Sequence, residues 1–167
     1  PAIRETVDME DHAALFRQAG PLGPLPDVRP GDEVQIQYTS GTTGFPKGVV
    51  LHHRGIVNNA RQGAERLGIE RGATVMVIMP LFHTAGCGLG ILGAVQFDNR
   101  MILVRQFDPQ QVNALIESEG VCGMMGVPTM LIAMLEADAQ TPRDFSSVTI
   151  VSSGGAILTG TPKTSPA

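Results

Sequence analysis

The sequence has 167 residues, of which 43% are hydrophobic and 17% are charged, and its formal net charge is −4. This length suits one domain with a core of its own, and this composition excludes a disordered chain. The acidic balance argues against nucleic acid as the main partner, because a surface that follows a phosphate backbone needs a basic excess.

Two further classes are disfavoured by the sequence. No apolar run approaches the roughly 20 residues that span a bilayer, and the first residues lack the basic and apolar regions of a signal peptide. The two cysteines, Cys87 and Cys122, are far apart and form no metal-binding or redox spacing. We therefore expect a reducing, cytoplasmic location and no transmembrane segment.

The first 32 residues predict a lead-in helix followed by a linker. Asp8 is a candidate N-cap, with Asp11 in the first helical turn and Gly20 at the helix end. The stretch PLGPLPDVRPGD that follows is rich in proline and glycine, which is typical of a linker.

From Glu33 onward, short apolar runs alternate with helical patterns. The run VQIQY predicts a half-buried strand with Val34, Ile36 and Tyr38 on one face. GVVLHH is a second strand candidate, and RGIVNNARQGAERLG predicts a helix that ends at Gly68. TVMVIMP is a continuous apolar run, which is typical of a strand buried on both faces.

The second half of the chain continues this alternation. AGCGLGILGAVQF predicts a helix and RMILV a strand. FDPQQVNALIESEG predicts a helix with Asp108 as N-cap, Pro109 at its first position and Gly120 at its end. VCGMMG predicts a strand, a helix starts at Pro128, and VTIVSSGG predicts a last strand. This repeated order predicts an α/β fold with a mostly parallel sheet flanked by helices.

One stretch, YTSGTTGFPKG, concentrates hydroxyls, glycines and a single lysine. Backbone N–H groups and hydroxyls aimed inward, together with one cation, bind the oxygens of a phosphate, and glycines let the backbone approach closely. The stretch differs from the common P-loop, because Gly48 stands where that pattern has Ser or Thr. The alternative interpretation is a flexible turn between two strands. The candidate phosphate-binding residues are Thr39, Ser40, Gly41, Thr42, Thr43, Gly44 and Lys47.

The longer stretch YTSGTTGFPKGVVLHHRGIVNNA resembles the phosphate-binding signature of the adenylate-forming (AMP-binding) enzymes, which include acyl-CoA synthetases, luciferases and peptide-synthetase adenylation domains. MPLFHTAG, GVPTML and SSGGAIL resemble three further motifs of this superfamily, in the same order. The likeness covers roughly residues 30–158, and it implies part of the large domain of an acyl-CoA synthetase-like fold. The pair Thr42-Thr43 and the histidine of PLFHTAG favour an acid–CoA ligase, most similar to medium- or long-chain fatty acyl-CoA synthetases.

The resemblance implies a reaction in two steps. A small-molecule carboxylate attacks the α-phosphate of Mg-ATP to give an acyl-adenylate and pyrophosphate, and coenzyme A then displaces AMP to give a thioester. ATP, Mg²⁺ and coenzyme A are thus the implied cofactors and co-substrates. The loop from Thr39 to Gly44 would hold the β- and γ-phosphates, and Lys47 would help to neutralise them. His83 would stand near the carboxylate and the α-phosphate; the alternative is a core histidine at a strand end.

The resemblance also assigns the last motif. Gly154, Gly155 and Ala156 would pass their backbone along the adenine ring; the alternative is a simple strand-to-helix turn. Residues 127–130 either line the acyl pocket or belong to the core. Four glycines in the helical stretch either allow tight packing on the sheet, the favoured interpretation, or leave room for an acyl chain: Gly86, Gly88, Gly90 and Gly93.

The pair His52-His53 has no partner cluster, so we expect no metal site there. Related proteins more often carry Ser or Thr near position 52, where that side chain caps the following helix. The histidine therefore argues against this cap.

We expect three parts: residues 1–32 as lead-in helix and linker, residues 33–160 as a partial AMP-binding domain, and residues 161–167 as an irregular tail. The resemblance implies longer family members whose Mg²⁺ ligand and catalytic C-terminal lysine follow these motifs. It thus predicts a central fragment of an AMP-forming acid–CoA ligase that is not fully active alone. The open alternatives are a non-catalytic nucleotide-binding or interaction module and a fragment of an aryl- or amino-acid-adenylating enzyme. We also expect self-association through exposed sheet edges.

Overall fold

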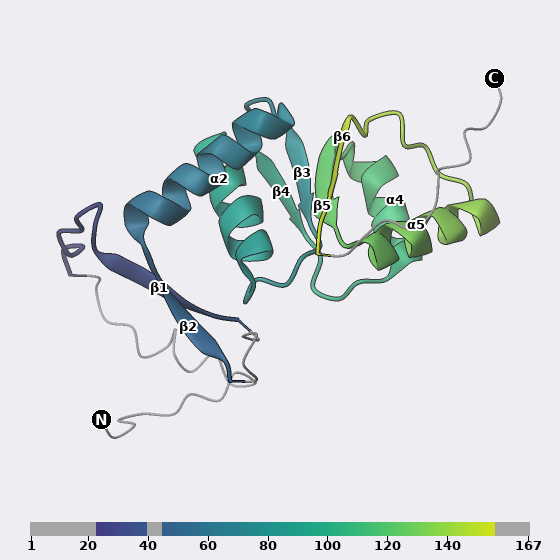
Figure 1. The fold of residues 1–167 in the computed structure, drawn as a ribbon. Helices are drawn as coiled ribbons and strands as arrows, with labels where there is room; N and C mark the ends of the chain where they lie inside the picture. Colours follow the sequence, from purple (N-terminus) through teal and green to yellow (C-terminus); the bar gives the residue numbers. More distant parts are fainter. Residues whose placement is uncertain (1–22, 40–44, 156–167) are drawn as a thin grey trace.

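The computed structural model describes residues 23–39 and 45–155. The predicted lead-in helix and the predicted tail at residues 161–167 lie outside these ranges. The described chain forms an antiparallel hairpin of β1 (Glu33–Thr39) and β2 (Lys47–His52), followed by a parallel sheet with helices (Figure 1).

The parallel sheet has four strands in the order β4-β3-β5-β6. Every neighbouring pair in it is parallel. This confirms the predicted α/β fold with a mostly parallel sheet. The strands are β3 (Thr74–Val77), β4 (Arg100–Leu103), β5 (Gly123–Gly126) and β6 (Ile150–Ser153).

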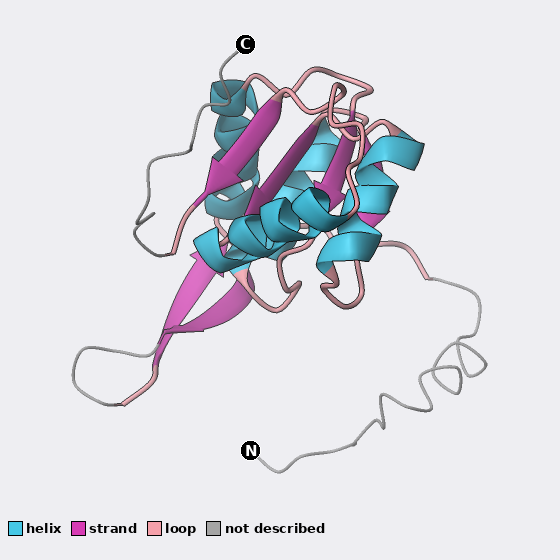
Figure 2. Ribbon diagram, turned by 90° about the vertical axis from the view of Figure 1, so that its right-hand side faces the viewer, coloured by secondary structure: helices cyan, strands magenta, loops and turns pink. Residues whose placement is uncertain are grey.

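Helices cover both faces of this sheet (Figures 1 and 2). One face carries α2 (His53–Leu67), the π-helix η2 (Ala85–Leu92) and α3 (Gly93–Gln96), and the other carries α4 (Pro109–Glu119) and α5 (Pro128–Gln140). None of the helices in the described part of the chain is both long enough and apolar enough to cross a membrane.

Strand β3 is buried on both faces, as its apolar run predicts. Met76 and Ile78 belong to a core cluster with Val112 and Ile116 of α4. Val77 points to the opposite face, where a Cβ atom added to Gly90 of η2 would lie 3.0 Å from its Cγ1. The sheet is thus packed between two helical layers.

The helical stretch at residues 85–97 is confirmed as helical, although its first eight residues form a π-helix. It packs very closely on the segment that precedes it. A Cβ atom at Gly86 would lie only 2.3 Å from the carbonyl oxygen of Pro80, which no real side chain tolerates. This supports tight packing as the reason for Gly86.

The predicted ends of α4 are confirmed. The carboxylate of Asp108 accepts a hydrogen bond from the N–H of Gln111 at 2.8 Å, and Gly120 ends the helix with φ +61°. Gly68 likewise ends α2 with φ +73°. These three positions follow the usual chemistry of helix caps.

The expectation for the start of α2 was wrong. His52 is the N-cap of this helix, and its Nδ1 accepts a hydrogen bond from the N–H of Gly55 at 2.9 Å. A ring nitrogen that carries no proton is an acceptor, so this imidazole performs the capping task of a Ser or Thr hydroxyl.

The hairpin also corrects one prediction. Strand β1 forms as expected, but Val34, Ile36 and Tyr38 are 44%, 59% and 68% exposed. The partly buried side chains are Gln35 and Gln37. The alternation was therefore identified correctly, but the apolar face, which a half-buried strand usually buries, is the exposed one.

Hydrogen bonds explain why the polar face of β1 turns inward. The Nε2 of Gln37 donates to the carbonyl oxygen of Phe82 at 3.1 Å, and the Nε2 of Gln35 lies 3.5 Å from the Sγ of Cys87. Both contacts join the hairpin to the segment between β3 and η2. The apolar face of β1 consequently points away from the parallel sheet.

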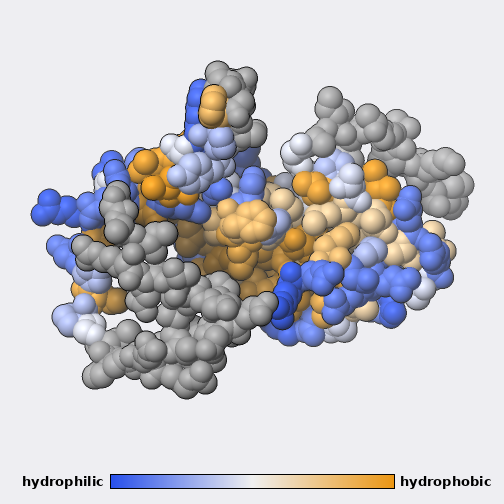
Figure 3. Space-filling view, turned by 90° about the horizontal axis from the view of Figure 1, so that it is seen from below, coloured by the Kyte–Doolittle hydropathy of each residue, from blue (hydrophilic) through white to orange (hydrophobic). Residues whose placement is uncertain are grey.

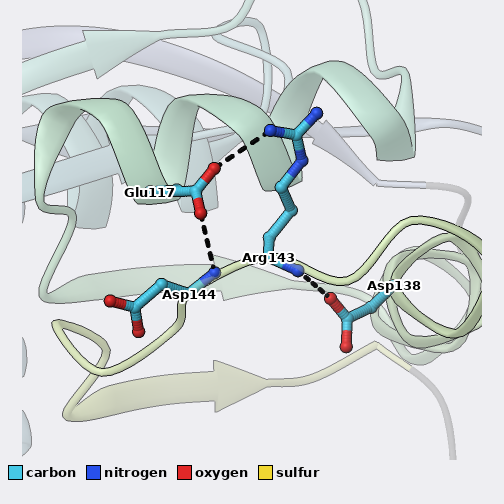
Figure 4. Close-up of polar contacts among 4 residues, drawn as sticks. All are labelled: Glu117, Asp138, Arg143 and Asp144. Carbon is cyan, nitrogen blue, oxygen red and sulfur yellow. Dashed lines mark hydrogen bonds and ion pairs between the residues drawn. The ribbon is translucent and has the colours of Figure 1, made fainter.

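The connection between α5 and β6 is fixed by polar contacts to α4 (Figure 4). Glu117 accepts hydrogen bonds from the N–H of Asp144 at 3.1 Å and from the Nη1 of Arg143 at 3.0 Å. The N–H of Arg143 also donates to the Oδ1 of Asp138 at 2.8 Å. The backbone bond from Asp144 and the pairing with Arg143 lower the pKa of the Glu117 carboxyl.

Candidate functional site

The carboxyl ends of the parallel strands meet at one edge of the sheet. Val77 is in register with Met125, and Met125 with Ser152, so β3, β5 and β6 end side by side. In open α/β sheets, ligands bind outside this edge, because loops rather than strands surround it. The predicted motif at residues 79–86 follows β3, and the motifs that begin at Gly126 and Ser152 start in the last residues of β5 and β6.

His83 lies in the segment after β3 and is exposed, so it is no core histidine. Its ring is fixed by the N–H of Ala85, which donates to Nδ1 at 3.1 Å. A neutral imidazole that accepts at Nδ1 carries its proton at Nε2. The geometry thus leaves Nε2 of His83 as a hydrogen-bond donor.

The end of the hairpin lies beyond the same edge of the sheet (Figures 1 and 2). Thr39 and Lys47 pair across β1 and β2, and both residues are exposed. The bond from Gln37 to Phe82 brings this end of the hairpin to the segment that carries the histidine. The other predicted phosphate-binding residues, Ser40 to Gly44, lie outside the described residues, so their role stays a prediction.

Gly154 and Gly155 follow β6 at this edge and are exposed. Gly155 has φ +86°, a backbone conformation that favours glycine. A Cβ atom there would lie 3.6 Å from the Cγ1 of Val127, which shows that the segments after β5 and β6 adjoin. Ala156 lies outside the described residues, and the contact with an adenine ring stays a prediction.

An apolar groove of about 440 Å³ lies on the sheet face that carries α2 and η2. Figure 3 views the molecule from the carboxyl edge of the sheet and shows apolar side chains gathered in the middle of this view. The floor of the groove is formed by residues of three strands: Val75, Val77, Gly123, Met125, Ile150 and Ser152. Its walls include Ala85 and Leu89 of η2 and Gly63 of α2.

The sequence did not predict most of this lining. Residues 127–130 were expected to line an acyl pocket or to belong to the core, and Met130 packs against the core cluster instead. None of these four residues lines the groove. The continuous apolar run of β3 predicted burial on both faces, but it did not reveal that one face borders a groove.

The described residues fit an anionic ligand at the end of the hairpin. The Lys47 side chain is exposed, and no described residue forms an ion pair with it. Around Gly154, no described atom lies within 4 Å of the place that a Cβ atom would take, which leaves room for a flat ring. Within residues 23–39 and 45–155, no three metal-ligating side chains gather, so no residue is assigned to Mg²⁺.

The chain is similar in sequence to known proteins. The family model described as "AMP-binding enzyme" matches residues 3–164. A protein of Bacillus subtilis (strain 168) named "Putative acyl-CoA synthetase YngI" is 40% identical over 129 residues, which are 77% of this chain and 23% of that protein. The 4-chlorobenzoate–CoA ligase of Pseudomonas sp. (strain CBS-3) is 35% identical over 156 residues, which are 92% of this chain and 30% of the ligase.

A solved structure gives the same result for the fold. The o-succinylbenzoate CoA synthetase of Bacillus subtilis, in complex with its acyl-adenylate intermediate, has a TM-score of 0.78 and 28% identity. The match covers 92% of this chain and 39% of that protein. The chain spans less than a third of each of the two curated relatives.

Proposed function

We propose, because this chain belongs to the family of AMP-binding enzymes, that it is part of an acid–CoA ligase. The observation that carries the proposal is the common edge of the sheet. There Gln37 of the hairpin, whose end carries Lys47, bonds to the segment of His83, and the Gly155 turn adjoins the segment after β5, all on the side of the sheet where an apolar groove begins. This arrangement offers one place each for phosphates, for a carboxylate and for an apolar acyl group.

The proposed reaction joins a carboxylic acid to coenzyme A at the expense of ATP. A carboxylate oxygen bonds to the α-phosphorus of ATP, and pyrophosphate leaves with the electron pair of the broken P–O bond. The sulfur of coenzyme A, which gives up its proton, then bonds to the acyl carbon, and AMP leaves. Mg²⁺ is the metal expected with ATP, and its ligands are not among the residues assigned above.

Two side chains of this chain would act on the charges that develop. Lys47, together with the predicted loop from Thr39 to Gly44, would offset the negative charge of the leaving pyrophosphate. His83 would donate its Nε2–H to the carboxylate or to the α-phosphate, because Ala85 occupies its Nδ1. Gly154, Gly155 and Ala156 would border the adenine.

We further propose that the acid is a medium- or long-chain fatty acid. Among the residues that line the groove, only Arg66 and Ser152 have polar side chains. An alkyl chain leaves no polar atom unpaired against such a lining, whereas a hydroxyl buried without a partner is costly. An aryl acid is the alternative, favoured by the likeness to the 4-chlorobenzoate ligase.

The test is a pyrophosphate-release assay on the full-length protein that contains this chain. ATP, Mg²⁺ and coenzyme A are supplied with straight-chain fatty acids of increasing length or with 4-chlorobenzoate, and the thioester is identified by mass. We expect turnover that depends on both the acid and coenzyme A, highest with a fatty acid. Release with 4-chlorobenzoate alone would show the aryl alternative, and no release with any acid would refute the ligase.

Lys47→Ala is the matching variant for the phosphate site. We expect it to lower kcat/KM by about 10²- to 10³-fold, because it removes a charge that opposes the leaving pyrophosphate. Arg61→Ala is the control, since Arg61 is an exposed cation on α2 that pairs with Glu65. Equal losses in the two variants would contradict the assignment of Lys47.

The cytoplasmic location stays a prediction.

A further inference from the structure

Leu89 of η2 lies directly on Gly63 of α2. A Cβ atom added to Gly63 would lie only 2.9 Å from the Cδ2 of Leu89, closer than real Cβ contacts. The leucine therefore occupies the space that a side chain at position 63 would need. This is the point at which the two helices close over one side of the apolar groove.

A second hollow lies on the other side of this contact. It has a volume of about 620 Å³ and shares Gly63, Arg66 and Leu89 with the apolar groove. Its remaining lining is polar: Asn59, Gln62 and Glu65. Leu89 is thus a wall between an apolar groove on the sheet and a polar hollow on the surface.

We propose that the contact between Leu89 and Gly63 closes the acyl groove and sets the longest acyl chain that the enzyme accepts. This inference rests on the proposed ligase function and names a determinant of its substrate length. A chain that stays within the groove contacts apolar side chains along its length. A longer chain meets the leucine and can extend only by displacing it into polar surroundings.

The wall is held in place by the packing of its helix. A Cβ atom at Gly90 would lie 3.0 Å from the Cγ1 of Val77, and one at Gly86 only 2.3 Å from the carbonyl oxygen of Pro80. The residues before and after Leu89 are therefore pressed against the sheet and its following segment. The helix has little room to move aside, so the size of residue 89 decides how far the groove extends on this side.

Two substitutions should shift the length preference in opposite directions. Leu89→Ala removes the wall and joins the groove to the surface hollow, so kcat/KM for longer acids should rise. Gly63→Ala places a methyl group only 2.9 Å from the Cδ2 of Leu89 and pushes the leucine toward the groove, so kcat/KM for longer acids should fall. Each methylene of the acyl chain that the groove buries changes kcat/KM by about fourfold. If a variant lets the groove hold two carbon atoms more or fewer, the ratio of kcat/KM for long and short acids should therefore change by about tenfold or more.

The double variant tests whether the contact itself is responsible. In the Leu89→Ala background the atom that Gly63→Ala would displace is gone. We therefore expect Gly63→Ala to have no further effect there, which is a strong coupling in a double-mutant cycle. Leu89→Met keeps the volume nearly constant and should leave the preference unchanged.

The experiment measures kcat/KM on the full-length enzyme for a series of saturated fatty acids, with thermal unfolding of each variant as a check of folding. Leu135→Ala is the matched control, because Leu135 lies on α5 at the opposite face of the sheet and is 67% exposed. Folded variants that activate acids with an unchanged long-to-short ratio, or a shift of the same size in Leu135→Ala, would overturn the inference. Activity with no fatty acid at all would instead refute the proposed substrate class.

Discussion

His83 and Lys47 reach the same edge of the sheet from different elements, and each presents one polar atom there. The histidine is the better defined of the two, because the N–H of Ala85 fixes its ring by a hydrogen bond to Nδ1. The Nδ1 of His83 thus holds the ring in place, while its Nε2 is the nitrogen proposed to act in the reaction. Substitutions that keep one nitrogen position and lose the other can distinguish them.

We expect His83→Ala to lower kcat/KM for the acid by about 10- to 100-fold, the loss typical of one hydrogen bond to a charged group. His83→Gln, whose amide nitrogen reaches a position similar to Nε2, should recover part of the activity. Steady-state kinetics with saturating ATP and coenzyme A measure both. If His83→Ala stays within twofold of the unchanged enzyme, His83 has no part in the reaction.

The cap of α2 makes a prediction about stability. His52→Ala should lower the free energy of unfolding by about 1 kcal/mol, because the N–H of Gly55 loses its acceptor. His52→Ser should restore most of this loss. Urea unfolding followed by circular dichroism measures the difference, with His53→Ala as the neighbouring control. A loss in His53→Ala as large as that in His52→Ala would contradict a capping role.

At this scale the sequence predicted those residues whose chemistry is local. Asp108 and Gly120 were identified because Asp at an N-cap and Gly at a helix end act through backbone groups a few residues away. His52 was missed because imidazole is not a usual cap, although its position directly before an apolar helical pattern was a signal. Leu89 and Gly63 were missed because their contact joins two different helices that lie far apart in the sequence.

The hairpin shows what periodicity can and cannot predict for an element. Alternation in VQIQY correctly predicted a strand and grouped its side chains into two faces. It could not predict which face is buried, because that depends on what lies opposite each face. Here Phe82 and Cys87 offer partners to the two glutamines, and this decides the orientation.

The link between α4 and the strand β6 predicts a dependence on pH. The pKa of the Glu117 carboxyl is lowered in the folded protein by the N–H of Asp144 and by Arg143. A lowered folded-state pKa means that the stabilisation is present above the unfolded-state pKa, near the ordinary value of 4.5, and is lost as the pH falls through the folded-state pKa. Glu117→Gln should therefore be less stable than the unchanged chain at pH 7, and this difference should shrink below about pH 4.5.

Urea unfolding at a series of pH values measures this difference. Glu136→Gln is the control, because Glu136 is an exposed carboxylate on α5 with no ion pair to a described residue. A constant gap between the Glu117→Gln variant and the unchanged chain from pH 7 to pH 3 would show that the ionised carboxylate is not responsible.

For the whole molecule, the repeated β-then-α order was sufficient to predict a parallel sheet between helical layers. The order β4-β3-β5-β6 was not predictable in the same way, because several strand orders satisfy the same alternation. The candidate site residues were predicted from motifs that resemble those of a known family, and their place at the carboxyl edge of the sheet became visible only in the fold. The groove was not predicted, since its lining comes from six elements that meet only in the fold.

The described chain also leaves apolar surface at the outer edge of its sheet. Within that part, β6 pairs only with β5, and Val151 on it is 50% exposed. An apolar groove of about 240 Å³ lies beside it, with Leu135, Phe145 and Val148 in its lining. Unpaired edges and apolar patches of this kind favour association with other chains.

We therefore expect the purified 167-residue chain to self-associate, and Val151→Lys to reduce this by placing a charge on the edge strand. Val95→Lys is the control, because Val95 is 56% exposed but lies on α3, away from this edge. Light scattering over a range of concentrations measures the mean mass. A monomer at every concentration, or equal effects of the two lysines, would contradict association through β6.

The exposed face of the hairpin has a practical consequence. The sequence has no tryptophan and a single tyrosine, Tyr38, which is 68% exposed and precedes Thr39 at the hairpin end. When the excitation wavelength is one that phenylalanine does not absorb, ultraviolet emission from this chain therefore originates at one phenol ring, next to the proposed phosphate-binding residues. Its intensity and anisotropy give an intrinsic optical reporter for titrations of this chain with ATP, free of added dyes and of signals from elsewhere in the chain.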